Sequence, residues 1–265
     1  MTGDPYACPN LNGSNAMLTL PMLATLGLGV LVTSFVSGIF GMAGGMLLMG
    51  LLLAIMPLSA AMVLHGVTQM TSNGWRAWLW RTQIDWRIVG WFAGGSVVAA
   101  IAFALFASVP SKAVALLMLG LTPFVAMALP ARAQLNVARP GHAVAGGAVC
   151  MFLQLLAGVS GPILDVFFVQ TGLDRRGIVA TKAAVQTLGH ALKLVYFGAV
   201  LSASRDELSP LIAIMAVVLA VAGTQGSRRV LEWISDAQFR QWSRRIIVGI
   251  SLVYLGQGAL LLLTP

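Results

Sequence analysis

The sequence predicts an all-α polytopic membrane protein. Hydrophobic residues make up 58% of the 265 residues and charged residues only 9%, whereas a soluble domain carries roughly 25% charged residues. Apolar runs longer than 18 residues recur from Leu18 to the end of the chain, as expected of helices that cross a bilayer. This composition excludes a water-soluble enzyme, and the absence of alternating ten-residue segments excludes a transmembrane barrel.

Ten helical segments are predicted from apolar runs read against glycine, proline and charge breaks. Two of them, 44–56 and 162–172, reach only about 20 and 16 Å, against a hydrocarbon core of about 30 Å. We expect each to be the second arm of a re-entrant hairpin. The ten segments are 18–40, 44–56, 58–80, 87–107, 111–131, 142–158, 162–172, 177–200, 208–226 and 246–262.

The basic residues predict the topology. In this topology hairpins 18–56 and 142–172 each return to the side of the membrane that they left, and the other six runs cross. The loops on one face then carry only two basic residues, Lys112 and Arg205. Positive loops mark the cytoplasmic side, so both termini are expected outside, with hairpin 18–56 entering from outside and 142–172 from the cytoplasm. The arginines of the cytoplasmic face are Arg81, Arg87, Arg132, Arg139, Arg175, Arg176, Arg228, Arg229, Arg240, Arg244 and Arg245.

The net charge of +8 therefore reports topology, and no nucleic-acid partner is expected. Cys8 and Cys150 lie far apart and form no CxxC pair, which indicates neither a disulfide framework nor a metal site. No cofactor is expected. Residues 1–17 contain no Lys or Arg and do not begin like a signal peptide.

An internal repeat appears at an ungapped offset of 117 residues, where Gly41-Met-Ala-Gly44-Gly45 falls on Gly158-Val-Ser-Gly161-Pro162. Each half holds a hairpin and three spans, and because three is odd the second half is inverted. Inverted repeats with broken helices that meet at the midplane are a recurrent transporter design. The expected parts are an extracytoplasmic segment 1–17, a first repeat 18–131, a cytoplasmic linker 132–141 and a second repeat 142–265.

The two glycine-rich hairpin tips predict an anion site. Each short arm begins roughly 16–20 Å deep, and a helix N-terminus offers free N–H donors and about half a positive charge. The alternative is that these glycines only permit close helix packing. The tip residues expected at the anion are Gly41, Ala43, Gly44, Gly45, Gly158, Ser160 and Gly161.

Polar residues on the following spans lie at matching positions. Gln69 aligns with Gln186 and Asn73 with His190 at the same offset. Both glutamines are roughly 14 Å from their helix starts and therefore central. We expect these four side chains to bind the anion, with interhelical hydrogen bonds as the alternative.

Ionisable residues within the spans are also candidates. Lys193 is deepest, and an intramembrane charge usually faces a cavity or has a partner; we expect it to attract the anion. Arg76 and Lys182 are charge partners or snorkel to the interface. Asp165 is expected to pair with Lys182 or Lys193, or alternatively to carry a coupling proton. His65 is expected to pack between helices rather than to carry a proton.

Two other functions compete with transport. Gly158-Val-Ser160-Gly161 matches the GxSG pattern of intramembrane serine proteases, with His190 as a conceivable base. The repeat disfavours this reading, because Ala43 stands at the position equivalent to Ser160. A non-transporting scaffold is the third reading, but a scaffold has little need for matched polar residues at mid-depth.

The segments Ser37-Gly-Ile-Phe-Gly-Met-Ala-Gly-Gly-Met-Leu-Leu-Met49 and Leu156-Ala-Gly-Val-Ser-Gly-Pro-Ile-Leu164, with a turn at Pro57, resemble the TauE/SafE family of anion transporters, also called the sulfite exporter family. The resemblance covers essentially the whole chain. It implies transport of sulfite, organosulfonates or related sulfur oxyanions, usually outward across a bacterial inner membrane.

We therefore expect a secondary carrier whose two halves rock around a midplane site. With the cell interior negative, export gains about 2.3 kcal/mol per anionic charge per 100 mV, so no coupling ion is required. The expected partners are a small anionic substrate and the lipid bilayer, and a homodimer is one candidate assembly.

Overall fold

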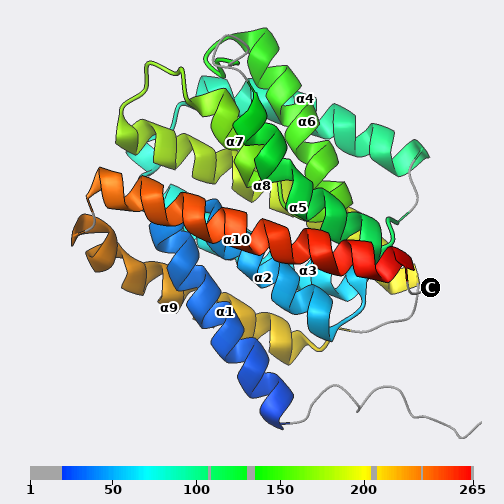
Figure 1. Ribbon diagram of the computed structural model, residues 1–265. Coiled ribbons are helices and arrows are strands. Elements are labelled where there is room, and N and C mark those ends of the chain that lie inside the picture. The colour runs from blue at the N-terminus through cyan, green and yellow to red at the C-terminus, as the bar shows by residue number, and fades with distance from the viewer. Residues whose placement is uncertain (1–19, 107–108, 130–134, 204–207, 234, 264–265) are drawn as a thin grey trace, which may run out of the picture.

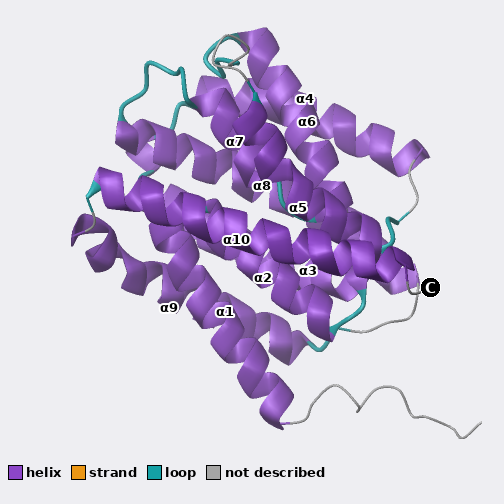
Figure 2. Ribbon diagram, in the orientation of Figure 1, coloured by secondary structure: helices purple, strands orange, loops and turns teal. Residues whose placement is uncertain are grey.

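The computed structural model describes residues 20–106, 109–129, 135–203, 208–233 and 235–263, and this part of the chain is helical without strands (Figures 1 and 2). The all-α prediction is confirmed. Segment 1–17, Arg132 and Arg205 lie outside the described residues. The helices are α1 (Leu20–Phe40), α2 (Met42–Ile55), α3 (Leu58–Leu79), the 3₁₀ turn η1 (Arg81–Gln83), α4 (Trp86–Phe106), α5 (Lys112–Ala128), α6 (Pro140–Ala157), α7 (Gly161–Phe168), α8 (Arg175–Ala203), α9 (Pro210–Trp233) and α10 (Asp236–Leu263).

The two short helices of the prediction are present. Helix α2 has 14 residues and α7 has 8, so they extend about 21 and 12 Å. Most of their residues are buried. Helix α2 is apolar on every side, and α7 carries one charged residue, Asp165. Both therefore lie inside the bundle, where α2 packs on α1, α3 and α10.

The breaks before these helices occur at two glycines separated by the repeat offset. Gly41 has φ 63° and Gly158 has φ 81°, and they are the glycines with positive φ in the described residues. Glycine adopts this conformation without the steric cost that a β-carbon adds. The chain can therefore leave α1 and re-enter α2 within a single residue, whereas the break between α6 and α7 takes the three residues Gly158 to Ser160.

Four helix pairs form most of the packing: α1 with α9, α4 with α6, α3 with α8 and α5 with α10. At the repeat offset α1 corresponds to α6 and α4 to α9. The α1–α9 and α4–α6 pairs are therefore counterparts, while α3–α8 and α5–α10 each join a helix to its own counterpart. Two similar halves related by a two-fold axis would pack in this way. The opposite orientation of the halves in the membrane stays a prediction.

Two of the pairs that join the halves are held close by glycine. A β-carbon added at Gly95 of α4 would collide with the Val144 carbonyl of α6, and one at Gly147 of α6 would collide with the Phe92 carbonyl of α4. On the counterpart pair, a β-carbon at Gly223 of α9 would lie 2.6 Å from the Leu31 carbonyl oxygen of α1. Small residues let helix backbones approach in this way within membranes.

Five helices among the described residues are long and apolar enough to cross a membrane: α1, α4, α6, α9 and α10. The chain is a multi-pass membrane protein. Helices α3 and α8 carry buried polar residues such as Gln69, Asn73 and Lys193, and α5 has 17 residues. Helices α1 and α6, the expected first arms of the hairpins, are themselves long enough to span. The count of six crossings stays a prediction.

Candidate functional site

A small polar chamber lies between the two hairpin tips. Its volume is about 10 Å³, room for about one water molecule, so the surrounding side chains must move apart to accept a larger ligand. The lining comes from α1, the start of α2, α3, the end of α6, the start of α7 and α8. The lining residues are Ser37, Gly41, Met42, Gly45, His65, Gln69, Asn73, Gln154, Val159, Ser160, Gly161, Gln186 and His190.

The halves contribute equivalent positions to this chamber. Four pairs of lining residues are separated by the repeat offset, two from the hairpins and two from α3 and α8. A weak sequence repeat thus corresponds to a shared cavity. The pairs are Ser37 with Gln154, Met42 with Val159, Gln69 with Gln186, and Asn73 with His190.

Three side-chain nitrogens around the chamber have no hydrogen-bond partner. Gln69 Nε2, Gln154 Nε2 and His190 Nδ1 are buried and unpaired, and they are three of the five such side-chain atoms among the described residues. An unpaired buried polar group costs about 1–3 kcal/mol, so native proteins seldom gather several in one place. Their convergence indicates a site for a ligand that accepts hydrogen bonds.

Neighbouring groups orient two of these side chains. Ser160 Oγ donates a hydrogen bond of 2.9 Å to Gln154 Oε1, which leaves the Gln154 amide nitrogen free to donate. Asn73 Nδ2 donates to the Gln69 carbonyl at 2.9 Å, one turn earlier on α3. Ser160 therefore bonds to a carboxamide rather than to His190, so the described contacts hold no nucleophile–base pair.

A buried chain of hydrogen bonds connects the two tips behind the chamber. Lys193 has no exposed surface, and its Nζ lies 2.8 Å from His65 Nδ1 and 3.2 Å from the Gly158 carbonyl oxygen. His65 Nε2 lies 3.0 Å from the Gly45 carbonyl oxygen. The rings of His65 and His190 are 5.4 Å apart. His65 thus bonds to a lysine as well as packing between helices.

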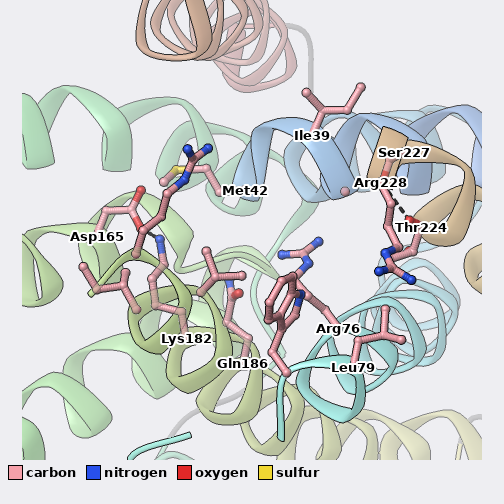
Figure 3. Close-up of a pocket in the computed structure, with 16 residues that line it drawn as sticks. Ile39, Met42, Arg76, Leu79, Asp165, Lys182, Gln186, Thr224, Ser227 and Arg228 are labelled. Atoms are coloured by element: carbon pink, nitrogen blue, oxygen red, sulfur yellow. Dashed lines mark hydrogen bonds and ion pairs between the residues drawn. The ribbon is translucent and has the colours of Figure 1, made fainter. Parts of the chain in front are cut away.

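A larger cavity, the vestibule, adjoins the chamber (Figure 3). It has a volume of about 500 Å³ and shares Gly41, Met42 and Gln186 with the chamber. Its lining includes four cationic side chains and the carboxylate of Asp165, which pairs with Lys182. Such a cavity concentrates anions. The four cations are those of Arg76, Arg175, Lys182 and Arg228.

Arg76 reaches from α3 to the end of α1, where its Nη2 donates to the Ser37 carbonyl at 2.9 Å. The C-terminal carbonyls of a helix carry partial negative charge, so the guanidinium is well placed there. Figure 3 shows Arg76 between the Asp165–Lys182 pair and Arg228. The sequence predicts that Asp165 pairs with Lys182 or Lys193, and in the structure its partner is Lys182.

The vestibule lies at the end of the bundle where the predicted cytoplasmic loops meet. The Arg176 guanidinium lies 5.4 Å from the Trp80 ring centre, and the Asp85 N–H donates to Thr181 Oγ1 at 3.0 Å. The α3–α4 connection and the start of α8 are therefore side by side. Trp86, the first residue of α4, is exposed.

The tip and span residues expected at the anion divide into two groups. Eight line the chamber: Gly41, Gly45, Gln69, Asn73, Ser160, Gly161, Gln186 and His190. Four do not: Ala43, Gly44, Gly158 and Lys193. A β-carbon on Gly44 would collide with the backbone of α1 at Thr33 and Ser37, so this glycine serves close helix packing.

Sequence reasoning missed Ser37 and Gln154 as lining residues. The signal was available, because both are polar residues in apolar runs and they align at the repeat offset. Ser37 and Gln154 precede the glycine turns, whereas the predicted site residues all lie at the turns, on the short second arms, or on the spans that follow them. Met42 and Val159, which also align, had no polar signal.

Comparison with known proteins gives one match. Residues 26–256 match the family model described as Sulfite exporter TauE/SafE, which includes both hairpin tips, the chamber and the vestibule. No curated protein and no solved structure matches the chain.

Proposed function

Because the chain belongs to the sulfite exporter TauE/SafE family, whose members are membrane transporters rather than enzymes, we propose that it is a secondary carrier for a small sulfur oxyanion. The family description names sulfite, and we include organosulfonates because they present the same kind of oxyanion group. The carrier acts in a bacterial inner membrane and exports the anion by alternating access.

The three unpaired nitrogens of the chamber carry this proposal. Amide N–H groups donate well to the oxygens of an anion, and a hydrogen bond to a charged group contributes about 1.5–3 kcal/mol. Gln69, Gln154 and His190 approach from α3, α6 and α8. An oxyanion would accept from both amide groups, and from His190 when its Nδ1 carries the proton, which a neutral apolar substrate would not do.

The vestibule is the proposed cytoplasmic entrance. Its cations draw the anion in, and Gln186 lies at the boundary with the chamber because it lines both cavities. For export from a cell with a negative interior, each net negative charge gains about 2.3 kcal/mol per 100 mV. The positive-inside distribution of arginines supports this orientation, with both termini outside.

The proposed architecture follows the repeat. Residues 18–131 and 142–265 form the two repeats and 132–141 connects them on the cytoplasmic side. The four aligned residue pairs around one chamber and the counterpart helix pairs support a two-fold relation between the halves. In this proposal the tips separate on one side of the membrane at a time.

The experiment that tests the proposal is flux into proteoliposomes. Sulfite, methanesulfonate and thiosulfate are offered as labelled anions, and we expect at least one to move faster than into protein-free liposomes. Gln154→Leu should reduce this flux by about 10-fold or more, since a hydrogen bond to the anion is lost. Gln257→Leu, an exposed glutamine on α10, is the matched control and should transport normally. If none of the anions moves and none stabilises the purified protein, the assignment is wrong.

A further inference from the structure

Lys193 is fully buried and has only neutral acceptors in its described contacts. Its Nζ contacts His65 Nδ1 and the Gly158 carbonyl. Asp165 on α7, the acid that the sequence offered as an alternative partner, bonds to Lys182 instead. A buried ammonium group without a counter-charge is expensive within a membrane, so the charge on this lysine requires compensation from elsewhere.

The hydrogen bonds around Lys193 are complete without an added proton. His65 Nε2 faces the Gly45 carbonyl and must carry hydrogen, which leaves Nδ1 of the neutral ring as an acceptor. A neutral amine has two N–H donors, and the two contacts of Lys193 use both. An ammonium group has three donors, and the third has no acceptor among the described contacts.

The chamber lies on the other side of His65. His65 and His190 both line it, and their ring centres are 5.4 Å apart. His65 thus both lines the chamber and bonds to Lys193, so it connects an anion in the chamber to the lysine. Charges interact strongly inside a low-dielectric interior, so the bound anion supplies the counter-charge that the protein lacks at this position.

Three cationic groups on the surrounding helices are engaged elsewhere or exposed. Arg76 donates to Ser37, Lys182 pairs with Asp165, and Arg87 is exposed at the start of α4. Helices α1 and α2 carry no ionisable residue. The remaining groups on α6 and α8 are His142, Cys150, Arg175, Arg176, His190 and Tyr196, of which His190 faces the chamber beside His65.

We infer that the Lys193–His65 pair is a proton-binding site that takes up one proton when the anion enters the chamber and releases it when the anion leaves. This inference rests on the proposed function and adds a co-substrate to it. The proton comes from water on the loading side. It binds either the lone pair of Lys193 Nζ or His65 Nδ1, and in the second case Lys193 Nζ accepts the hydrogen bond from the ring. The two nitrogens therefore bind one proton as a unit. It returns to water on the far side.

The consequence is a carrier that moves one proton with each anion. A monoanion then crosses without net charge, whereas a dianion carries one net negative charge and still gains from the membrane potential. Affinity and pH are linked, because the loaded state holds one proton more than the empty state. We expect the dissociation constant of the anion to rise about tenfold per pH unit.

The test uses proteoliposomes loaded with a pH-sensitive dye and the labelled anions of the flux assay. Methanesulfonate and thiosulfate keep a fixed charge between about pH 6 and about pH 8, so the dependence of anion affinity on pH is measured over this range. For sulfite, the proton and anion movement seen in protein-free liposomes is subtracted. We expect one proton to enter with each anion, and an imposed pH gradient to drive anion accumulation. If no anion moves, the proposed function fails. If the anion moves without a proton, only the present inference fails.

Three variants separate the proton site from a structural role. Lys193→Arg stays charged at every accessible pH, so anion uptake should persist while proton movement and the pH dependence of affinity disappear. Lys193→Met should weaken anion binding about tenfold or more and also abolish proton movement. Lys112→Met, in the first turn of α5 and outside both cavities, should behave as wild type. Unchanged proton coupling in Lys193→Arg or Lys193→Met would overturn the inference.

Discussion

Replacing Gln69 with leucine should stabilise the protein and impair its transport. The Gln69 side chain is 3% exposed, and its Nε2 has no partner. Leucine is close in volume and removes the unpaired donor, while the bond from Asn73 to the Gln69 backbone carbonyl is kept. The free energy of unfolding should therefore rise by about 1–3 kcal/mol.

The same substitution removes a donor to the anion. A hydrogen bond to a charged ligand contributes about 1.5–3 kcal/mol, so the dissociation constant should rise by about 10- to 150-fold. The two effects have opposite signs because the chamber is arranged for a ligand rather than for the empty protein.

Two measurements on the same preparation check this prediction. Thermal unfolding in detergent should shift upward by about 2–4 °C for each kcal/mol, without added anion. Flux into proteoliposomes should fall. Gln257→Leu on the outer surface of α10 should change neither. A loss of stability in Gln69→Leu would mean that the amide nitrogen has a partner, and the argument from unpaired donors would collapse.

Three further outcomes are expected. Gly41→Ala meets nothing within 4 Å, but φ 63° and ψ −110° lie outside the left-handed helical region, so the backbone strain should cost about 1–3 kcal/mol. Gly158 is left-handed helical, and Gly158→Ala should lower the unfolding temperature because its β-carbon crowds two methionine sulfurs. Ser160→Ala should keep flux within several-fold of wild type, and the wild-type protein should not react with a serine-hydrolase probe. Arg228→Gln should raise the KM for the anion several-fold at low salt, with the difference shrinking at high salt as screening increases.

Each of these has a contrary result. A wild-type melting temperature in Gly41→Ala would contradict the backbone strain at Gly41, and one in Gly158→Ala would show that the Gly158 turn is less crowded than described. Probe labelling that disappears in Ser160→Ala would favour the protease reading. A salt-independent effect of Arg228→Gln would place that guanidinium in direct contact with the substrate.

The helices and the central position of the site were predictable from the sequence because they depend on local signals. Apolar runs mark the helices, and the breaks at Gly41 and Gly158 are visible as glycine clusters that recur at one offset. Gln69 and Gln186 were found because polar residues are rare at that depth. Both line the chamber.

The contact between Lys193 and His65 was not predictable in the same way. These residues are 128 positions apart, and their meeting depends on how α3 and α8 cross. Gly44 illustrates a second limit. Its neighbours in the sequence resemble those of Gly45, yet Gly44 packs against α1. A β-carbon added at Gly45 would instead lie 3.4 Å from the Gln69 carboxamide. Which side of a helix meets a cavity is decided by packing.

The close pairing of α1 with α9 and of α4 with α6 has a consequence for movement. Each of these pairs takes one helix from either half of the chain, and glycine contacts hold their backbones together. Rigid bodies that follow these contacts would therefore combine helices from both halves, and they would not coincide with the two proposed repeats. A chain cut at the 132–141 connection would have to exchange helices between its fragments before either could fold, and neither fragment should transport alone.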